Sequence, residues 1–175
     1  MKNFIRVIAV CLLLLNQQVS AQELKSEFLF DLDLDVAPPQ FIGSASNGTR
    51  LIFPYKGGLV KGDKITGKIL AGGGDWGLVL DSNTFKPDAR ATIETADGAQ
   101  ILVTYTGYNY ASVKNVATIT AGKGGELSPN DYYFRTSVSF ETSAPKYAWL
   151  NHTIGVGVGR FIAAGKVSYR IYAIR

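Results

Sequence analysis

The stretch EFLFDLDLDV, residues 27–36, decides the fold, because apolar and acidic side chains alternate along most of it. A period of two is that of a β-strand, whose successive side chains point to opposite faces. The two predicted faces are Phe28, Phe30, Leu32, Leu34 and Val36 against Asp31, Asp33 and Asp35. The stretch therefore predicts a sheet with one solvated face. We interpret the aspartates as the outer face of an edge strand, where charge opposes sheet-to-sheet association.

The period of two continues along the chain, and no window of a dozen residues carries a helical stripe. Further strands are predicted at residues 50–55, 64–70, 76–80, 89–95, 100–108, 113–120, 132–141, 148–159 and 166–174. Turn residues such as Asn47-Gly48 and Asp97-Gly98 separate them. Many short strands at even spacing predict an all-β sandwich or closed barrel. Because no linker or repeat divides the chain, we expect one domain over residues 22–175.

The first 21 residues have the pattern of a cleavable secretory signal. Lys2 and Arg6 precede an apolar run over residues 7–15, and Val19-Ser20-Ala21 supplies the small side chains that signal peptidase requires. We expect cleavage after Ala21 and a secreted or periplasmic protein. The apolar run is about half the roughly 20 residues that a spanning helix needs, so no stable membrane anchor is expected after cleavage.

The composition of the mature chain excludes several kinds of site. Its one cysteine, Cys11, leaves with the signal, which removes disulfides, thiolate nucleophiles and cysteine-bound metals together. Cleavage also removes Lys2 and Arg6, so the formal net charge falls from +4 to +2. The remaining basic residues are scattered, and the stripe that a phosphate backbone requires is missing. We therefore expect no nucleic-acid partner; the oligomeric state stays open.

Known catalytic templates find little support. His152 is the only histidine, so a histidine-activated nucleophile is weakly supported, and we expect His152 to be a surface or hydrogen-bonded residue of a strand. Zinc favours several His or Cys ligands, and Asp31, Asp33 and Asp35 lack the later glycine and glutamate of a calcium loop. The glycines of residues 155–159 lack the spacing of a dinucleotide loop. We expect no metal and no cofactor.

The hairpin around Asp97-Gly98 can be aligned residue by residue. If these two residues are the centre of a type I′ turn, Glu94 lies opposite Ile101 and Arg90 opposite Tyr105. Opposed residues share a face, so one face would mix charged and apolar side chains. That face is either the solvent side or the interior of a barrel wide enough to hold one small ligand.

Several short motifs occur in an order that resembles the DUF3237 family, also called UPF0311. They are Gly72-Gly73-Gly74-Asp75-Trp76, Asp88-Ala89-Arg90, Asp97-Gly98-Ala99, Tyr133-Phe134-Arg135-Thr136, and Phe140-Glu141-Thr142 with Tyr147-Ala148-Trp149-Leu150-Asn151. The resemblance implies a single closed antiparallel β-barrel with a central pocket. Most members have no assigned function, and a few relatives are similar to enzymes that cyclise or isomerise small molecules without metal or organic cofactor.

The residues that remain for chemistry are carboxylates, tyrosines and arginines. Glu94 or Asp75 is a candidate general base if an apolar cavity raises its pKa. Arg135, Arg90 or Tyr105 is a candidate to stabilise negative charge on an enol or phenol oxygen. Further candidate pocket residues are Trp76, Tyr133, Trp149 and Asn151. The alternative is that Glu94 forms an internal salt bridge with one of the arginines, and that the tryptophans belong to the core.

Two functions follow as hypotheses. In the first, an exported barrel rearranges a small, largely apolar and oxygenated molecule by acid-base chemistry, as a cofactor-independent cyclase, isomerase or lyase. In the second, the same pocket binds or carries such a ligand in the periplasm without chemistry. A third alternative is a structural or adhesion domain with a filled barrel, and the sequence leaves open whether the protein is an enzyme.

N-terminal sequencing of the exported protein tests the signal directly. We expect the mature chain to begin at Gln22 or within a residue or two of it, because the small side chains at residues 19–21 position the peptidase there. A soluble cytoplasmic protein that retains Met1 would contradict the prediction.

Overall fold

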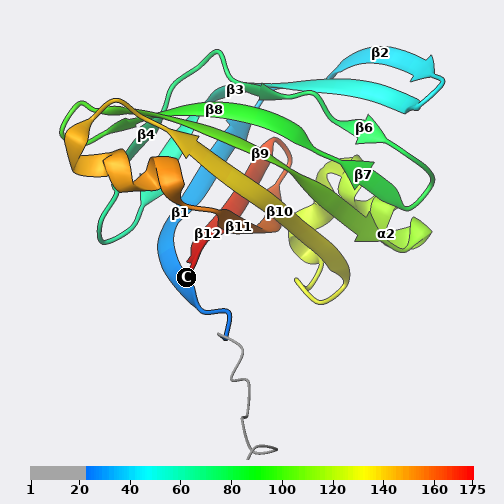
Figure 1. The fold of residues 1–175 in the computed structure, drawn as a ribbon. Helices are drawn as coiled ribbons and strands as arrows, with labels where there is room; N and C mark the ends of the chain where they lie inside the picture. Colours follow the sequence, from blue (N-terminus) through cyan, green and yellow to red (C-terminus); the bar gives the residue numbers. More distant parts are fainter. Residues whose placement is uncertain (1–22) are drawn as a thin grey trace, which may run out of the picture.

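The computed structural model describes residues 23–175, and the predicted signal over residues 1–21 lies outside this described part. Strands dominate the fold, as predicted from the period of two (Figure 1). None of the helices within residues 23–175 is both long and apolar enough to cross a membrane.

Twelve antiparallel strands form one sheet. They are β1 (Ser26–Val36), β2 (Gln40–Ala45), β3 (Gly48–Lys61), β4 (Gly67–Ile69), β5 (Gly74–Asp75), β6 (Leu78–Val79), β7 (Thr84–Lys86), β8 (Asp88–Thr95), β9 (Gln100–Ala111), β10 (Tyr132–Glu141), β11 (Gly155–Ala163) and β12 (Lys166–Ile174). Hydrogen-bonded pairs run β1-β12-β11-β10-β9-β8-β4-β3, and β3 pairs in turn with β1. The sheet is therefore barrel-like, and the short strands β2, β5, β6 and β7 attach to its side.

Strand β1 has the predicted alternation, with Leu32 and Leu34 buried. A β-bulge between Phe28 and Phe30 breaks the period at the start of the strand, because one extra residue reverses the side on which the preceding side chain lies. Phe28 is consequently exposed, against the predicted face, and Leu29 is buried instead.

The prediction that β1 is an edge strand is wrong, because β1 is hydrogen-bonded to β12 on one side and to β3 on the other. Its outward aspartates lie beside cations of these neighbours. Asp31 pairs with Arg170 at 3.0 Å, and Asp35 pairs with Lys166 at 2.6 Å. The acidic face therefore forms cross-strand ion pairs, each of small energetic weight because it is exposed.

Strand β11 explains the glycines that interrupt its sequence. Gly155, Gly157 and Gly159 point to the inner face, opposite large side chains of β10. A Cβ on Gly159 would lie 2.5 Å from the ring of Phe134, and one on Gly157 would lie 2.4 Å from Thr136 Oγ1. Glycine at these positions lets β10 fill the interior, and the run is part of a strand rather than of a phosphate-binding loop.

Two of the predicted strands are helical, the first throughout and the second in part. Residues 113–120 form helix α2 (Val113–Thr118), which leads into η1 (Ile119–Lys123) and η2 (Gly124–Glu126). Ser112 caps α2 by accepting a hydrogen bond from the Asn115 amide, and Val116 and Ile119, three residues apart, pack against the core. The β-branched residues of this segment favour strand as isolated residues, but the cap and the spacing of three favour a helix.

The second helical segment is η3 (Pro145–His152), which replaces the first half of the strand predicted at residues 148–159. Pro145 begins this helix, and two of its residues, Tyr147 and Leu150, are buried. His152 ends η3 and is exposed, so it is a surface residue but not one of a strand. In Figure 1 this segment and α2 lie at opposite ends of the barrel-like sheet.

Truncation of Leu32 tests the inner face of β1. Leu32 is fully buried, so we expect Leu32→Ala to lower the free energy of unfolding by about 2 to 5 kcal/mol, through lost burial and the cavity left behind. Leu59 is half exposed, and Leu59→Ala as the matched control should change stability by less than about 0.5 kcal/mol. Equal losses in urea unfolding would contradict the assignment of faces.

Candidate functional site

The hairpin at Asp97-Gly98 turns through three residues rather than two. The Thr95 amide donates a hydrogen bond to the Ala99 carbonyl at 2.9 Å, which leaves residues 96–98 as the loop. Gly98 has a φ of 84°, and no described non-glycine residue has a positive φ. This is the pattern of a type I turn closed by a glycine bulge, whereas the predicted type I′ turn requires two residues with positive φ.

The extra loop residue shifts every predicted pair of the hairpin by one. Arg90 lies opposite Thr104 instead of Tyr105, and Glu94 lies opposite Gln100 instead of Ile101. A shift of one residue exchanges the two faces of a strand. Arg90 and Glu94 are therefore on the outer face, while Tyr105 is on the inner face.

The charged candidates of β8 form ordinary surface contacts. Glu94 pairs with Lys68 at 2.7 Å, and Arg90 pairs with Asp88 at 3.2 Å while lying 5.9 Å from the centroid of the Trp76 ring. The expected internal salt bridge of Glu94 with Arg90 or Arg135 is likewise not formed, because the partner of Glu94 is Lys68. The carboxylate of Glu94 does not enter the interior.

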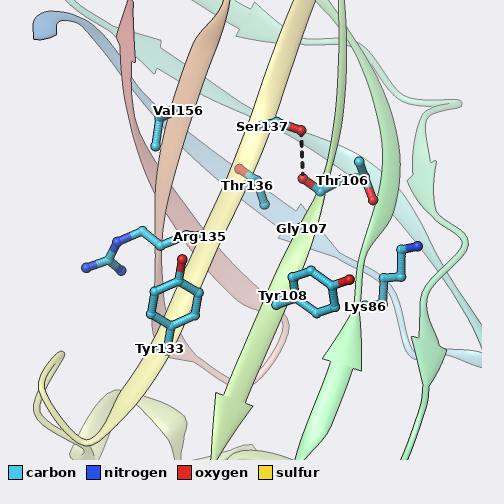
Figure 2. Close-up of a pocket in the computed structure, with 9 residues that line it drawn as sticks. All are labelled: Lys86, Thr106, Gly107, Tyr108, Tyr133, Arg135, Thr136, Ser137 and Val156. Carbon is cyan, nitrogen blue, oxygen red and sulfur yellow. Dashed lines mark hydrogen bonds between the residues drawn. The ribbon is translucent and has the colours of Figure 1, made fainter. Parts of the chain in front are cut away.

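Arg135 and Tyr133 lie on the outer face of β10, beside a shallow hollow of about 420 Å³ (Figure 2). Residues of β7, β9, β10 and β11 line it: Lys86, Thr106, Gly107, Tyr108, Tyr133, Arg135, Thr136, Ser137 and Val156. The Arg135 guanidinium donates to the Phe134 carbonyl at 2.9 Å and lies 5.4 Å from the centroid of the Tyr133 ring. Arg135 and Tyr133 therefore lie close together, but on the outer face of the sheet.

The other candidates are dispersed. Trp76 is about one-third exposed beside Arg90, and Trp149 is partly buried under the Arg175 guanidinium, 5.6 Å away. Asn151 is exposed and exchanges two hydrogen bonds with the Thr142 backbone, at 2.8 and 2.9 Å, which fastens η3 to the end of β10. Asn151 therefore has a structural role in this geometry.

Asp75 is the one candidate carboxylate that the fold buries, with 6% of its surface exposed. It lies on β5 between β3 and β8, and its Oδ1 accepts a hydrogen bond from the Asp88 amide at 2.8 Å. Burial penalises the ionised form and raises the pKa of Asp75 to about 7, against the smaller opposing effect of the Asp88 amide. The carboxyl group is thus poised to gain or lose a proton near neutrality.

Three buried tyrosines share the interior with Asp75. The Tyr55 and Tyr105 hydroxyl groups lie 2.6 Å apart in a hydrogen bond, and the Tyr105 and Tyr169 ring centroids are 4.9 Å apart. Burial raises the pKa of all three phenols above their usual range, and the nearby charge of Asp75 adds to this effect. The three hydroxyl groups therefore stay protonated and able to donate hydrogen bonds.

Tyr105 and Asp75 are among the candidates named from the sequence, whereas Tyr55 and Tyr169, which the structure places with them, are not. Tyr169 belongs to the strand predicted at residues 166–174, and the structure buries it on β12. Tyr55 ends a predicted strand and gave no signal beyond its apolar neighbours. What the sequence lacked was the long-range strand pairing of the barrel-like sheet, which brings side chains of β3, β9 and β12 together.

Two inner side chains of the same region carry unpaired oxygens. Within the described residues, Asn109 Oδ1 and Thr136 Oγ1 are buried and have no hydrogen-bond partner. Thr136 pairs with Gly107 of β9 and with Gly157 of β11, so glycine lies on both sides of its hydroxyl group. Buried polar atoms normally find a partner, and a ligand or water can supply it.

This arrangement can carry out proton transfer between oxygen and carbon atoms. A carboxyl group with a pKa near neutrality serves as acid or base, and protonated phenols stabilise a developing oxyanion. Within residues 23–175, no cluster of three or more His, Asp or Glu side chains is arranged to hold a metal ion.

Comparison with known sequences places this arrangement in a family. The family model described as "Protein of unknown function (DUF3237)" matches residues 24–174. A UPF0311 protein of Clostridium acetobutylicum is 34% identical over 133 residues, 75% of this chain and 83% of the relative. A UPF0311 protein of Rhodopseudomonas palustris TIE-1 is 31% identical over 134 residues, covering 77% and 86%. A hydroalkoxylation enzyme of Penicillium herquei is 28% identical over 131 residues, covering 75% and 71%.

Solved structures agree with these relatives. A β-barrel-like protein of Acinetobacter baumannii AYE has a TM-score of 0.77 and 34% identity, and covers 90% of this chain and 100% of its own. A protein of unknown function from Rhodopseudomonas palustris has a TM-score of 0.83 and 28% identity, with coverage of 89% and 100%. An enzyme of Penicillium herquei, at 22% identity and a TM-score of 0.63, shares the fold, with coverage of 89% and 97%.

The pH dependence of stability tests the environment of Asp75. Between its ordinary pKa of 3.8 and about 7, the native state holds a proton that the unfolded state releases, so stability should fall as the pH rises through this range. The full difference corresponds to roughly 4 kcal/mol. Asp75→Asn cannot ionise, and its amide oxygen can still accept from the Asp88 amide, so its stability should vary less between about pH 4 and 8.

Asp63, an exposed acidic residue of a loop, gives the matched control: Asp63→Asn should keep the wild-type profile. Urea unfolding at a series of pH values measures all three proteins. Parallel profiles for wild type and Asp75→Asn would show that Asp75 ionises normally in the native state.

Proposed function

Since the chain belongs to the DUF3237 family, we propose that it is an enzyme that rearranges a small, oxygenated and largely apolar molecule by acid-base chemistry. The proposal places the reaction inside the sheet, closed into a barrel, rather than on its outer face. The observation that carries it is the buried Asp75, whose pKa of about 7 lies far above its ordinary value beside three protonated tyrosines.

Asp75 acts in this proposal as the general base. It removes a proton from a hydroxyl group or an activated carbon of the substrate. In the hydrogen-bonded pair of Tyr55 and Tyr105, the phenol whose proton is not engaged by the other donates a hydrogen bond to the oxygen that becomes negative. The proton on Asp75 then returns to another atom of the same molecule. Such an isomerisation or ring closure balances without an oxidant, a reductant or an additional reactant.

The fungal relative supports this class of reaction. Hydroalkoxylation adds an O–H bond across a carbon-carbon double bond, so one base and one acid suffice for it. The interior is otherwise built from apolar and aromatic side chains, which suits a substrate of the same character. The unpaired Thr136 Oγ1 offers such a substrate a polar contact within the same interior.

In the proposal, the substrate reaches the buried Asp75 from the surface at β5. Gly72, Gly73 and Gly74 precede the carboxylate, and a Cβ on Gly72 would meet no atom within 4 Å. Trp76 follows it and is about one-third exposed. In our proposal, small movements of this glycine-rich segment admit the substrate.

Export belongs to the same proposal. It is supported by the pattern of residues 1–21 alone, and it places the substrate in the periplasm or outside the cell. A carrier without catalytic activity is the alternative, since the same interior would then hold a ligand unchanged.

Cyclisation of an ortho-prenylated phenol, followed by proton NMR, tests the proposal with a probe that contains both reacting groups. We expect slow conversion by the wild type, with kcat/KM rising with pH to a plateau above about pH 7, because the base must be ionised. Asp75→Asn should lose at least about 100-fold in kcat. Glu94→Gln, the outer-face control, should be unchanged.

Tight binding of the probe with no conversion would support the carrier instead. Equal conversion by wild type and Asp75→Asn would remove Asp75 from the mechanism.

A further inference from the structure

The hollow on the outer face of β9, β10 and β11 is separate from the buried Asp75 and is not used by the proposed reaction. Gly107 and Thr136 are among its lining residues, and Figure 2 shows Thr106 and Ser137, which also line it, above Gly107. At about 420 Å³ it has the size of a small-molecule site. We propose that it binds an aromatic carboxylate.

Two tyrosine rings give the hollow its aromatic character. Tyr108 and Tyr133 are 49% and 53% exposed, and they come from neighbouring strands with Arg135 directly opposite Tyr108. Figure 2 shows both rings over the lower part of the hollow, between Arg135 on one side and Lys86 on the other. Half-exposed rings at such a position provide flat surfaces against which a planar ligand packs.

The charge of the hollow selects an anion. Its lining contains Lys86 and Arg135 and no acidic residue. Within residues 23–175 neither cation has a carboxylate within ion-pair distance, and the nearest acidic residue along β8, Asp88, is paired with Arg90 at 3.2 Å. The charged side chains that line the hollow are therefore both cationic, one at each side of the tyrosine rings, and an entering carboxylate meets no opposing acidic residue of the lining.

Arg135 is oriented before any ligand arrives. Its Nη1 donates to the Phe134 carbonyl at 2.9 Å, and its guanidinium lies 5.4 Å from the Tyr133 ring centroid. A guanidinium held in this way loses little conformational entropy when its remaining N–H groups bind a carboxylate. The planar, charged group and the adjacent ring together match a molecule that has a ring next to a carboxylate.

The hydroxyl groups at the edge of the hollow add a preference for a hydroxylated ring. Thr106 Oγ1 donates to the Pro87 carbonyl at 2.9 Å, and Ser137 Oγ donates to the Thr106 carbonyl at 3.3 Å. With their protons engaged, both oxygens still have lone pairs that accept from a ligand O–H group. We therefore use para-hydroxybenzoate as the probe.

Position 107, which lines the hollow, requires glycine. A Cβ on Gly107 would lie 2.0 Å from the Arg135 carbonyl oxygen and 2.6 Å from the Thr136 Cα, so any side chain there would push β10 away. Because Gly107 lines the hollow, the NMR signal of its amide reports on a ligand bound there.

Titration of the mature protein with para-hydroxybenzoate, observed by amide NMR and calorimetry, tests the site. We expect the Gly107, Tyr108 and Arg135 amides to shift together along one binding curve. Affinity should fall about tenfold for Arg135→Met, the loss expected when one charge-assisted hydrogen bond is removed, and also when salt is raised from about 0.05 to 0.5 M. Lys86→Met should weaken binding in the same direction.

Matched controls separate the site from general charge. Lys56→Met removes an exposed cation of β3 and should leave the affinity unchanged. Acetate, which has the charge without the ring, and para-hydroxybenzyl alcohol, which has the ring without the charge, should each bind at least about tenfold more weakly. Unfolding curves of all variants exclude loss of fold as the cause.

Three results would each overturn the proposal: equal affinity for the alcohol or for acetate, an Arg135→Met variant that binds as well as the wild type, or amide shifts confined to residues around Asp75. The last result would assign the probe to the interior and leave the hollow without a ligand.

Discussion

The pairing of β1 with both β12 and β3 is the constraint on which the rest of the structure depends. Leu32 lies opposite Tyr169 of β12 and opposite Val60 of β3, so one strand joins the two ends of the sheet. Without it, β12 and β3 would each present a free edge. The two pairings of β1 place β3 and β12 on either side of it, and inside this barrel-like sheet Tyr105 contacts both Tyr55 and Tyr169.

The pairing of β10 with β11 decides how part of the interior is filled. Residues at the inner face of β10 are large, and their neighbours on β11 are glycines, so the two strands share one layer of side chains. Small-large alternation of this kind fits side chains into a barrel-like sheet. Thr136 is smaller and polar, unlike the other inner residues of β10. Its hydroxyl group has no hydrogen-bond partner and lies between Gly107 and Gly157.

Much of the fold could be predicted from local patterns, because they report which side of a strand faces the core. The bounds Tyr132–Glu141 and Lys166–Ile174 are those of β10 and β12. The errors arise where one residue changes the period: the bulge after Phe28, and the third loop residue at Gly98. Residues 113–118 were mistaken for a strand because β-branched side chains outweighed the cap at Ser112.

The candidate site was harder to predict than the fold, because it depends on that same register. The loop of residues 96–98 moves Glu94 to the outer face, where it pairs with Lys68, and moves Tyr105 inward. Asp75 is a candidate from the sequence, but its burial follows from β3 and β8 on either side of a two-residue strand, which no local pattern reveals. The environment of each candidate residue therefore depends on tertiary pairing, which local sequence patterns do not report.

The burial of Asp75 is costly in a way that packing does not explain. A carboxyl group removed from water with one backbone hydrogen bond is destabilising relative to an amide of the same shape, which keeps the bond and has no charge to desolvate. Asparagine would thus serve the fold as well or better at pH 7. A buried residue that lowers stability is commonly kept for function rather than for folding. Residues with perturbed pKa values in particular cluster at functional sites. The surface pairs of Glu94 and Arg90 carry no such cost, which is why the interior, rather than the outer face of β8, is the stronger place for proton transfer.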